Sequence, residues 1–323
     1  EALQPAGDTS ISIGTWHVGR EGYYPTDQGF DENVGGWTHG SPPSYWDPYT
    51  SDKDWNPWIP TLEPRKEGEY LTDRLTDEAI AFMRAHRGGP FLCYLPHYAV
   101  HTPLQAPEDL VEKYKKRGDA QIDPVYAAMV ERVDEGLGRM LTALDDMGLT
   151  ENTAVIVASD NGALAEVADN RPYRAGKGHL YEGGIRVPLI VRWPGRVKPG
   201  GVNDTPTISE DLYATVVDMA GPKAEPGAPL DGRSLVGELT GAAALEERDL
   251  HWYYPHYSPQ AKAPGAAIRS GPWKLIEFYD PAHIELYHLG DDISETENLA
   301  ADRPEVAEDL RERLHVWLKD SGT

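Results

Sequence analysis

The sequence is short of cysteine: Cys93 stands alone among 323 residues. An intrachain disulfide is therefore excluded, and a cytosolic chain and a disulfide-free exported chain both fit this count. No run of residues approaches the ~18 consecutive apolar residues that a membrane-spanning helix needs. The chain starts at Glu1 without an initiator methionine or a signal peptide. We expect it to begin inside a domain, so that the lack of a targeting segment carries no information.

Basic residues are also scarce. Lys and Arg number 30 against 53 Asp and Glu, which gives a formal net charge of -23. This balance argues against nucleic acid as a partner, because contacts with its phosphates need an excess of Lys and Arg. The hydrophobic share of 40% and the charged share of 26% are ordinary for a globular protein with a sizeable core. The length allows one large domain with an appendage, or two domains.

Hydrophobic periodicity predicts alternating strands and helices in the first 245 residues. Short apolar runs at residues 10–13, 91–95 and 154–158 are typical of strands, and the last of these is expected to be buried on both faces. Apolar stripes predict helices over residues 69–86 and 124–147, the second capped by Asp123. This alternation indicates an α/β fold with a mixed, largely parallel sheet between helices.

The pattern changes after residues 241–245. Four short strands are expected between residues 250 and 288, followed by a final helix. Strands followed by one helix are typical of a small antiparallel α+β subdomain. We therefore predict an α/β domain over residues 1–245 and a C-terminal antiparallel-sheet subdomain over residues 246–323.

Polar side chains follow the strand at residues 154–158. Asp160-Asn161-Gly162 places two oxygen-bearing side chains where open α/β sheets bind their ligands. The loop beyond supplies Arg171, Arg174 and Lys177, cations suited to an oxyanion. Metal-type oxygens beside cations indicate a site for an anionic ester.

Histidines and aromatic residues stand in other loops. His17 follows the first strand, and His101 follows the strand at residues 91–95. A loop histidine can also be without a function. Residues 37–60 are rich in Trp and Tyr, which suit either stacking on sugar faces or pinning the loop to the core. The aromatic segment around His256 is interpreted either as a second surface for a saccharide or as a structural strand and turn of the small subdomain.

Several motifs together carry a resemblance to a known family. They are Gly14-Thr15-Trp16-His17-Val18-Gly19, Ala99-Val100-His101-Thr102-Pro103, Ser159-Asp160-Asn161-Gly162, Gly176-Lys177-Gly178 and Tyr181-Glu182-Gly183-Gly184-Ile185-Arg186-Val187-Pro188. In this order the chain resembles the type I sulfatases of the alkaline-phosphatase superfamily. Residues 267–275 and 286–289 resemble that family's C-terminal subdomain.

The resemblance implies hydrolysis of sulfate esters at a Ca²⁺ site, with a formylglycine nucleophile made from the first residue of Cys/Ser-x-Pro-x-Arg. Asp160 and Asn161 resemble calcium ligands, which suits a cation that prefers oxygen. His17, His101 and Lys177 resemble catalytic residues of the family, and His101 and Lys177 also resemble sulfate contacts.

Two further residues are predicted to bind substrate. Thr15 stands where the family has a sulfate-binding lysine, so its single uncharged hydroxyl is expected to bind sulfate more weakly. His256 belongs to the second aromatic segment and is predicted to contact a saccharide. The expected ligand is a sulfated small molecule or saccharide.

The family's paired aspartates and its nucleophile motif have no equivalent in the sequence. Cys93 is followed by a proline one place too late, and Ser41 begins a similar motif in which Tyr45 replaces the arginine. We expect an N-terminally incomplete sulfatase that is inactive as it stands, because a covalent mechanism needs its nucleophile. The remaining calcium ligands and the formylglycine are expected in a preceding segment, and the full-length protein would need a formylglycine-generating enzyme.

Alternatives to an active sulfatase stay open. One is a non-catalytic remnant that binds sulfated glycans, and another is a phosphoester hydrolase of the same superfamily, which would need a Thr or Ser nucleophile and a second metal. The compartment is not fixed by the sequence, although the resemblance favours a periplasmic or secreted protein.

Overall fold

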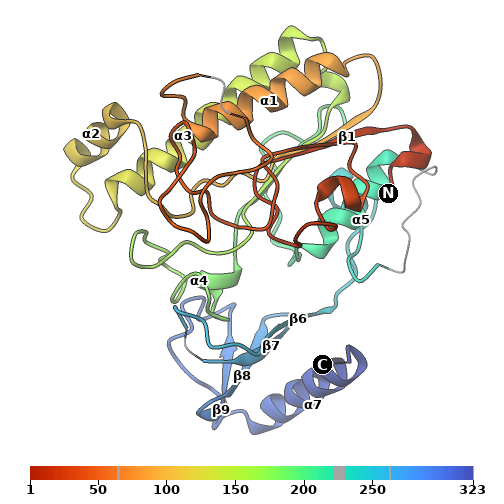
Figure 1. Ribbon diagram of the computed structural model, residues 1–323. Helices are drawn as coiled ribbons and strands as arrows, with labels where there is room; N and C mark the ends of the chain where they lie inside the picture. Colours follow the sequence, from red (N-terminus) through yellow and green to blue (C-terminus); the bar gives the residue numbers. More distant parts are fainter. Residues whose placement is uncertain (64–65, 222–229, 262, 323) are drawn as a thin grey trace. The chain divides into compact units, whose positions relative to one another are not determined.

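The computed structural model describes residues 1–63, 66–221, 230–261 and 263–322 (Figure 1). It contains two compact units that interleave along the chain. Unit 1 comprises Glu1–Ala154, Trp193–Val202 and Ser209–Thr240, and unit 2 comprises Val155–Arg192, Asn203–Ile208 and Gly241–Thr323. The domain boundary between residues 245 and 246 stays a prediction.

The elements of unit 1 are three strands, five α-helices and three short 3-10 helices among the residues described. The strands are β1 Thr9–Ile13, β2 Glu32–Val34 and β3 Phe91–Tyr94. The α-helices are α1 Leu71–Ala85, α2 Glu108–Arg117, α3 Pro124–Asp146, α5 Glu210–Ala220 and α6 Val236–Thr240. The 3-10 helices are η1 Gln4–Ala6, η2 Pro25–Gln28 and η3 Thr150–Asn152.

A parallel sheet forms the centre of unit 1. Its strand order is β2-β1-β3, and β1 pairs in parallel with both neighbours. Helix α1 contacts β1, β3 and α3, and α2 packs on α3. The predicted α/β class is confirmed, because the helical and strand periodicities fall on separate segments that alternate along the chain.

The two long helices begin and pack as their sequences predict. Leu71, Leu75, Ala79 and Phe82 recur on one face of α1, and all four are buried. The Asp123 carboxylate accepts hydrogen bonds from the backbone N–H groups of the first turn of α3, at 2.8 and 3.1 Å. These faces close the main hydrophobic core of unit 1 against the sheet.

The aromatic loop at residues 37–60 contains both buried and exposed aromatic side chains. Tyr45 and Tyr49 are buried, so they pin the loop to the core. Trp55 and Trp58 keep 58% and 55% of their surface exposed and stay available to a ligand. Pinning of the loop is therefore confirmed for its buried tyrosines, and stacking on sugar faces stays a prediction for its exposed tryptophans.

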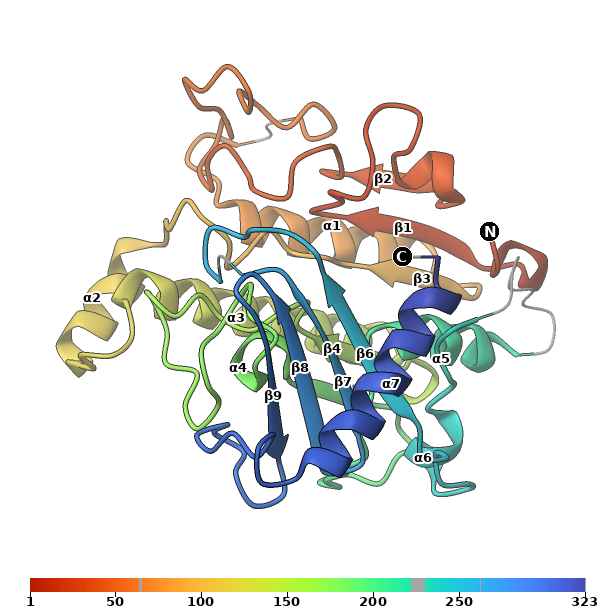
Figure 2. The ribbon, with the colours of Figure 1, turned by 90° about the horizontal axis from the view of Figure 1, so that it is seen from below.

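Unit 2 holds two antiparallel sheets. Strands β4 Val155–Ala158 and β5 Leu189–Arg192 form one pair, with the short helix α4 Glu182–Ile185 between them in sequence. The four-stranded sheet has the order β6-β7-β8-β9, with α7 Pro304–Asp320 packed on β7 and β8 (Figure 2). Its strands are β6 Asp249–Tyr254, β7 Gly265–Ser270, β8 Trp273–Tyr279 and β9 Ala282–His288. The predicted antiparallel α+β arrangement is confirmed.

The prediction that the strand at residues 154–158 is buried on both faces is wrong. Residues 155–157 are half-buried and Ala158 is exposed. Among the residues that the structure describes, β5 alone pairs with β4, so one edge of β4 has no neighbouring strand. Its β-branched composition indicated a strand correctly but could not indicate how many strands flank it.

A search of the described residues for a long apolar helix found none that could cross a membrane. The longest helix, α3, carries charged residues along its length.

Candidate active site

The carboxyl ends of β1 and β3 meet in unit 1. The backbone N–H of Thr15 donates to the carbonyl of Pro96 at 2.8 Å. Gly14 has a φ of 114°, and a Cβ at this position would lie 2.1 Å from the same carbonyl oxygen. Glycine is therefore required here, because only a residue without a side chain permits this approach and this backbone conformation. The contact joins the segment of Thr15 and His17 to the loop that carries His101.

His17 stands in a strained turn just after β1. Its φ of 51° is unusual for a residue other than glycine. Its backbone N–H donates to the Trp37 carbonyl at 3.1 Å, and its ring lies against Gly40, where a Cβ would approach Nδ1 to 2.4 Å. The aromatic loop thus holds His17 in place, with the histidine exposed to solvent.

His101 is held by its backbone and leaves its side chain exposed. Its N–H donates to the Tyr98 carbonyl at 2.9 Å, and the buried Tyr45 hydroxyl donates to the His101 carbonyl at 2.9 Å. The Nδ1 atom lies 3.1 Å from the Thr102 carbonyl, which orients the ring. The pinned aromatic loop therefore also positions this histidine.

The same loop contains His97, a residue that the sequence did not single out as a site. Both of its ring nitrogens are buried and have no hydrogen-bond partner in the described part of the chain. Burial lowers the pKa of His97 to about 4, because the charged imidazolium loses its hydration. His97 is thus neutral at neutral pH. The sequence did contain a signal for His97, because this residue and Pro96 lie at the carboxyl end of a predicted strand.

Thr15 carries a buried hydroxyl whose Oγ1 has no partner among the described residues. Burying a hydroxyl without a hydrogen bond costs roughly 1–3 kcal/mol. We expect Thr15→Val, which keeps the shape and removes the hydroxyl, to raise the free energy of unfolding by about 1 kcal/mol in urea denaturation without ligand. A loss of stability would show that the hydroxyl already has a partner, such as an ordered water. Thr205→Val is the control, because this threonine lies in a loop of exposed and half-buried residues.

In unit 2, the turn after β4 presents two oxygen-bearing side chains. The Asn161 Nδ2 donates to Asp160 Oδ2 at 2.6 Å, and the Ser159 hydroxyl donates to the Asn161 carbonyl at 2.9 Å. Asp160 is exposed and Asn161 is half-buried. The turn is therefore ordered by its own hydrogen bonds and keeps further carboxylate and amide oxygen lone pairs for a ligand.

Lys177 lies in the same hydrogen-bonded assembly. Its backbone N–H donates to the Ala163 carbonyl at 3.0 Å, and the Gly162 N–H donates to the Gly184 carbonyl in α4 at 2.9 Å. Lys177 is half-buried, and no partner of its Nζ is found in the described residues. The loop and α4 thus hold the predicted calcium ligands and this ammonium on one small framework.

The donor set of the turn suits calcium in kind. Asp160 and Asn161 offer oxygen atoms, which this cation prefers, but calcium takes roughly 6–8 oxygens. No group of three or more His, Cys, Asp or Glu side chains that could hold a metal was found in the described part of the chain. The two residues can therefore hold calcium only together with further ligands.

His256, predicted to bind substrate, lies at the surface of unit 2. Its ring packs edge-on against Tyr254 at 5.5 Å between centroids. The segment that follows approaches the lysine loop, since a Cβ at Gly178 would lie 3.2 Å from the Ser258 hydroxyl. The aromatic segment thus borders the loop of Lys177, which the sequence alone did not indicate.

Comparisons with known proteins identify the family of the chain. Residues 1–222 match the family model described as Sulfatase, and residues 175–321 match N-sulphoglucosamine sulphohydrolase, C-terminal. The fold and the motifs are those of the alkaline-phosphatase superfamily. Within that superfamily, the chain belongs to the sulfatase family, whose members are sulfuric ester hydrolases.

Individual relatives extend the match over most of the chain. A sulfatase from Formosa agariphila is 34% identical over 81% of this chain and 52% of its own length. The N-acetylgalactosamine-6-sulfatase of Mus musculus is 32% identical over 78% of this chain and 50% of its own length. The crystal structure of Ps i-CgsB in complex with k-i-k-neocarrahexaose has a TM-score of 0.82 at 27% identity, covering 98% of this chain and 72% of that one. The chain spans about half the length of these two curated relatives.

Proposed function

We propose that this chain forms part of a calcium-dependent hydrolase of sulfate esters that acts on a sulfated saccharide. The observation that carries the proposal is the framework of unit 2, where Asp160, Asn161 and Lys177 are tied together by the hydrogen bonds of Gly162 and Ala163. A site for sulfate needs oxygen ligands for a cation beside a fixed positive charge, and this framework supplies both.

Each residue has a distinct role in the proposal. Asp160 and Asn161 would hold calcium, which when bound neutralises charge on the sulfate group. The Lys177 ammonium would donate hydrogen bonds to a sulfate oxygen and assist departure of the alcohol. His101 would supply a proton to the leaving oxygen. His17 would accept or donate a proton beside the nucleophile.

A saccharide is favoured as the rest of the substrate. Exposed Trp55 and Trp58 in unit 1 and His256 beside Tyr254 in unit 2 offer flat surfaces for sugar rings. One relative is named for a sulfated amino sugar, and a structural relative was solved with an oligosaccharide. We keep Thr15 among the proposed substrate contacts, because a hydroxyl can donate one hydrogen bond to a sulfate oxygen.

The test joins the chain at Glu1 to the preceding segment of the Formosa agariphila sulfatase, which is expected to bring the nucleophile motif. The fusion is co-expressed with a formylglycine-generating enzyme and assayed on aryl and sugar sulfates. We expect turnover that stops when calcium is chelated. Lys177→Ala should lower kcat/KM by about 100-fold or more, since a positioned charge or proton donor contributes roughly that much. Lys198→Ala, at an exposed loop lysine, should leave the rate unchanged.

Two results would contradict the proposal. The first is a folded, formylglycine-bearing fusion that turns over no sulfate ester with calcium present. The second is a clear preference for phosphate monoesters over sulfate esters, which would place the protein with the phosphoester hydrolases of the superfamily.

A further inference from the structure

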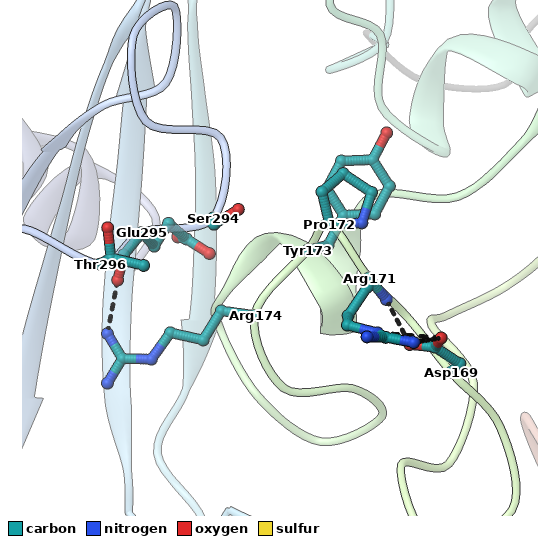
Figure 3. A pocket seen from close by; sticks show the side chains of 8 residues that line it. All are labelled: Asp169, Arg171, Pro172, Tyr173, Arg174, Ser294, Glu295 and Thr296. Atoms are coloured by element: carbon teal, nitrogen blue, oxygen red, sulfur yellow. Dashed lines mark hydrogen bonds and ion pairs between the residues drawn. The ribbon is translucent and has the colours of Figure 1, made fainter. Parts of the chain in front are cut away.

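A separate cavity opens in unit 2 between two loops. It has a volume of about 970 Å³ and is lined by Asp169, Arg171, Pro172, Tyr173, Arg174, Ser294, Glu295 and Thr296 (Figure 3). One wall belongs to the loop that carries Lys177, and the other follows β9. Arg171 and Arg174, two of the loop cations that the sequence offered for an oxyanion, are among these residues, whereas the proposed catalytic and calcium-binding residues are not.

The Arg174 guanidinium is fixed in this cavity with one edge left open. Its Nη1 donates to the Tyr287 hydroxyl and to the Glu295 carbonyl, both at 2.9 Å, and its Cζ lies 3.9 Å from the centre of the Tyr181 ring. No hydrogen-bond partner of Nη2 or Nε is found in the described residues, and 40% of the side chain is exposed. A planar fork held on one side presents the other two donors in the geometry that binds an oxyanion.

The opposite wall is equally well ordered. The Asp292 carboxylate accepts hydrogen bonds from the backbone N–H groups of Thr296 and Glu297 at 2.7 and 2.9 Å. The Glu295 carboxylate accepts one from the buried Lys274 ammonium at 2.8 Å and one from the Glu182 N–H at 2.7 Å. The loop of Ser294 is thereby fixed before any ligand arrives, which lowers the entropy cost of binding.

Acidic groups around the cavity are ion-paired or hydrogen-bonded. The Asp169 carboxylate is paired with Arg171 at 2.7 Å, and Glu295 is fully buried on Lys274. Glu285, whose Oε2 lies 3.9 Å from Arg174 Nη1, accepts hydrogen bonds from the hydroxyls of Tyr181 and Tyr287 at 2.8 and 2.7 Å. Arg174 therefore lines the cavity with its Nε and Nη2 donors open, while Glu285 lies within ion-pair distance on the Nη1 side.

Arg174 lies three residues before Lys177, so their Cα atoms are at most about 11 Å apart. We propose that this cavity binds an anionic group on the sugar next to the one whose sulfate ester meets Lys177. The ligand class is thus a saccharide with negative charges on neighbouring sugars, carried as sulfate or as carboxylate. This inference rests on the proposed function and narrows its substrate.

The test measures binding to the 323-residue chain by titration calorimetry. The probes are a disaccharide with one sulfate, the same disaccharide with a second sulfate on the neighbouring sugar, and one with a carboxylate there. We expect the second anion to raise affinity about ten-fold, since charge-assisted hydrogen bonds are the strong ones. The two dianionic probes show which anion the cavity prefers.

Substitutions test whether the second anion binds in this cavity. Arg174→Gln should abolish the gain from the second anion and leave binding of the monosulfated probe unchanged, while Arg174→Lys should keep part of the gain. Ser294→Trp should weaken the gain by placing a bulky ring on the wall of the cavity opposite Arg174. Arg303→Gln, which removes an exposed arginine elsewhere in unit 2, should have no effect.

Near-UV circular dichroism checks that each variant is folded. If Arg174→Gln does not fold, Ser294→Trp serves as the test of the cavity. Equal affinity of the wild-type chain for the monoanionic and dianionic probes, or no binding of either, would overturn the inference. So would an equal loss of both affinities in Arg174→Gln. Turnover of monosulfated esters by the fusion protein, measured separately, would still support the proposed function in each of these cases.

Discussion

Lys274→Met is expected to lower the free energy of unfolding by about 3–5 kcal/mol, the cost of leaving a buried charge without its partner. The Lys274 side chain is fully buried in β8, with its ammonium 2.9 Å from Glu182 Oε1 and 2.8 Å from Glu295 Oε1. Both carboxylates are almost completely buried as well. Methionine fills a similar volume, so the loss measures the charge and not the packing.

The loss should depend on pH. Burial already raises the pKa of Glu295, with the Lys274 ammonium opposing that rise, and removing the ammonium would raise it further. A carboxyl whose pKa is raised on folding contributes its stability below the unfolded pKa and loses it as pH rises through the folded pKa. Lys274→Met should therefore be less destabilising near pH 4.5 than near pH 7.5.

Urea denaturation at the two pH values provides the measurement. Lys113→Met is the control, because this lysine pairs with Glu131 at the surface, where solvent screens an ion pair and the loss should be small. The double variant Lys274→Met with Glu295→Gln should recover part of the loss. A loss below 1 kcal/mol that does not change with pH would show that the carboxylates are satisfied without Lys274.

Most of the fold was predictable because its signals are local. The apolar stripe of α1, the Asp123 cap of α3 and the four short strands near the C-terminus all depend on residues close together in the sequence. Helix α2, Glu108–Arg117, was not predicted, since it is mostly charged and buries only Val111. A helix without an apolar stripe leaves no periodic signal.

Features that join distant segments could not be read from the sequence. Lys274 and Glu182 are 92 residues apart, and neither stands in a pattern that indicates burial. The half-exposed state of β4 depends on its number of neighbouring strands, which its own residues do not encode. The ordered edge of Arg174 also needs Tyr181, Tyr287 and the Glu295 carbonyl, which come from three segments.

The candidate site was predictable from the sequence only in part. Its position at strand ends followed from general rules for α/β sheets, and the turn of Asp160 and Asn161 was expected for that reason. The individual roles of His17, His101 and Lys177 came from the resemblance to sulfatases and stay predictions until the fusion protein is assayed. The bond network that holds Lys177 to α4 became visible only in the structure, because it consists of backbone hydrogen bonds.

That network makes Gly162→Ala the second substitution with a large expected effect. A Cβ at Gly162 would lie 1.7 Å from the Gly183 carbonyl oxygen and 3.0 Å from the Gly184 Cα, both backbone atoms of α4. A rigid backbone cannot yield as a flexible side chain does, so α4 would have to move and the Gly162 hydrogen bond to Gly184 would be lost. We expect a destabilisation of about 3 kcal/mol or more, at the upper end for overpacking.

Gly138→Ala is the matched control, since a Cβ there meets no atom within 4 Å in the middle of α3. It should stabilise the chain by about 1 kcal/mol through helix propensity. Urea denaturation compares the two variants, and hydrogen exchange follows the amides of Gly162, Lys177 and Gly184. If Gly162→Ala shifts α4, these amides exchange faster together, because the turn of the predicted calcium ligands and the lysine loop share one framework. Unchanged stability and exchange would mean that the turn after β4 and α4 do not depend on each other. The framework proposed to hold Asp160, Asn161 and Lys177 together would then be wrong.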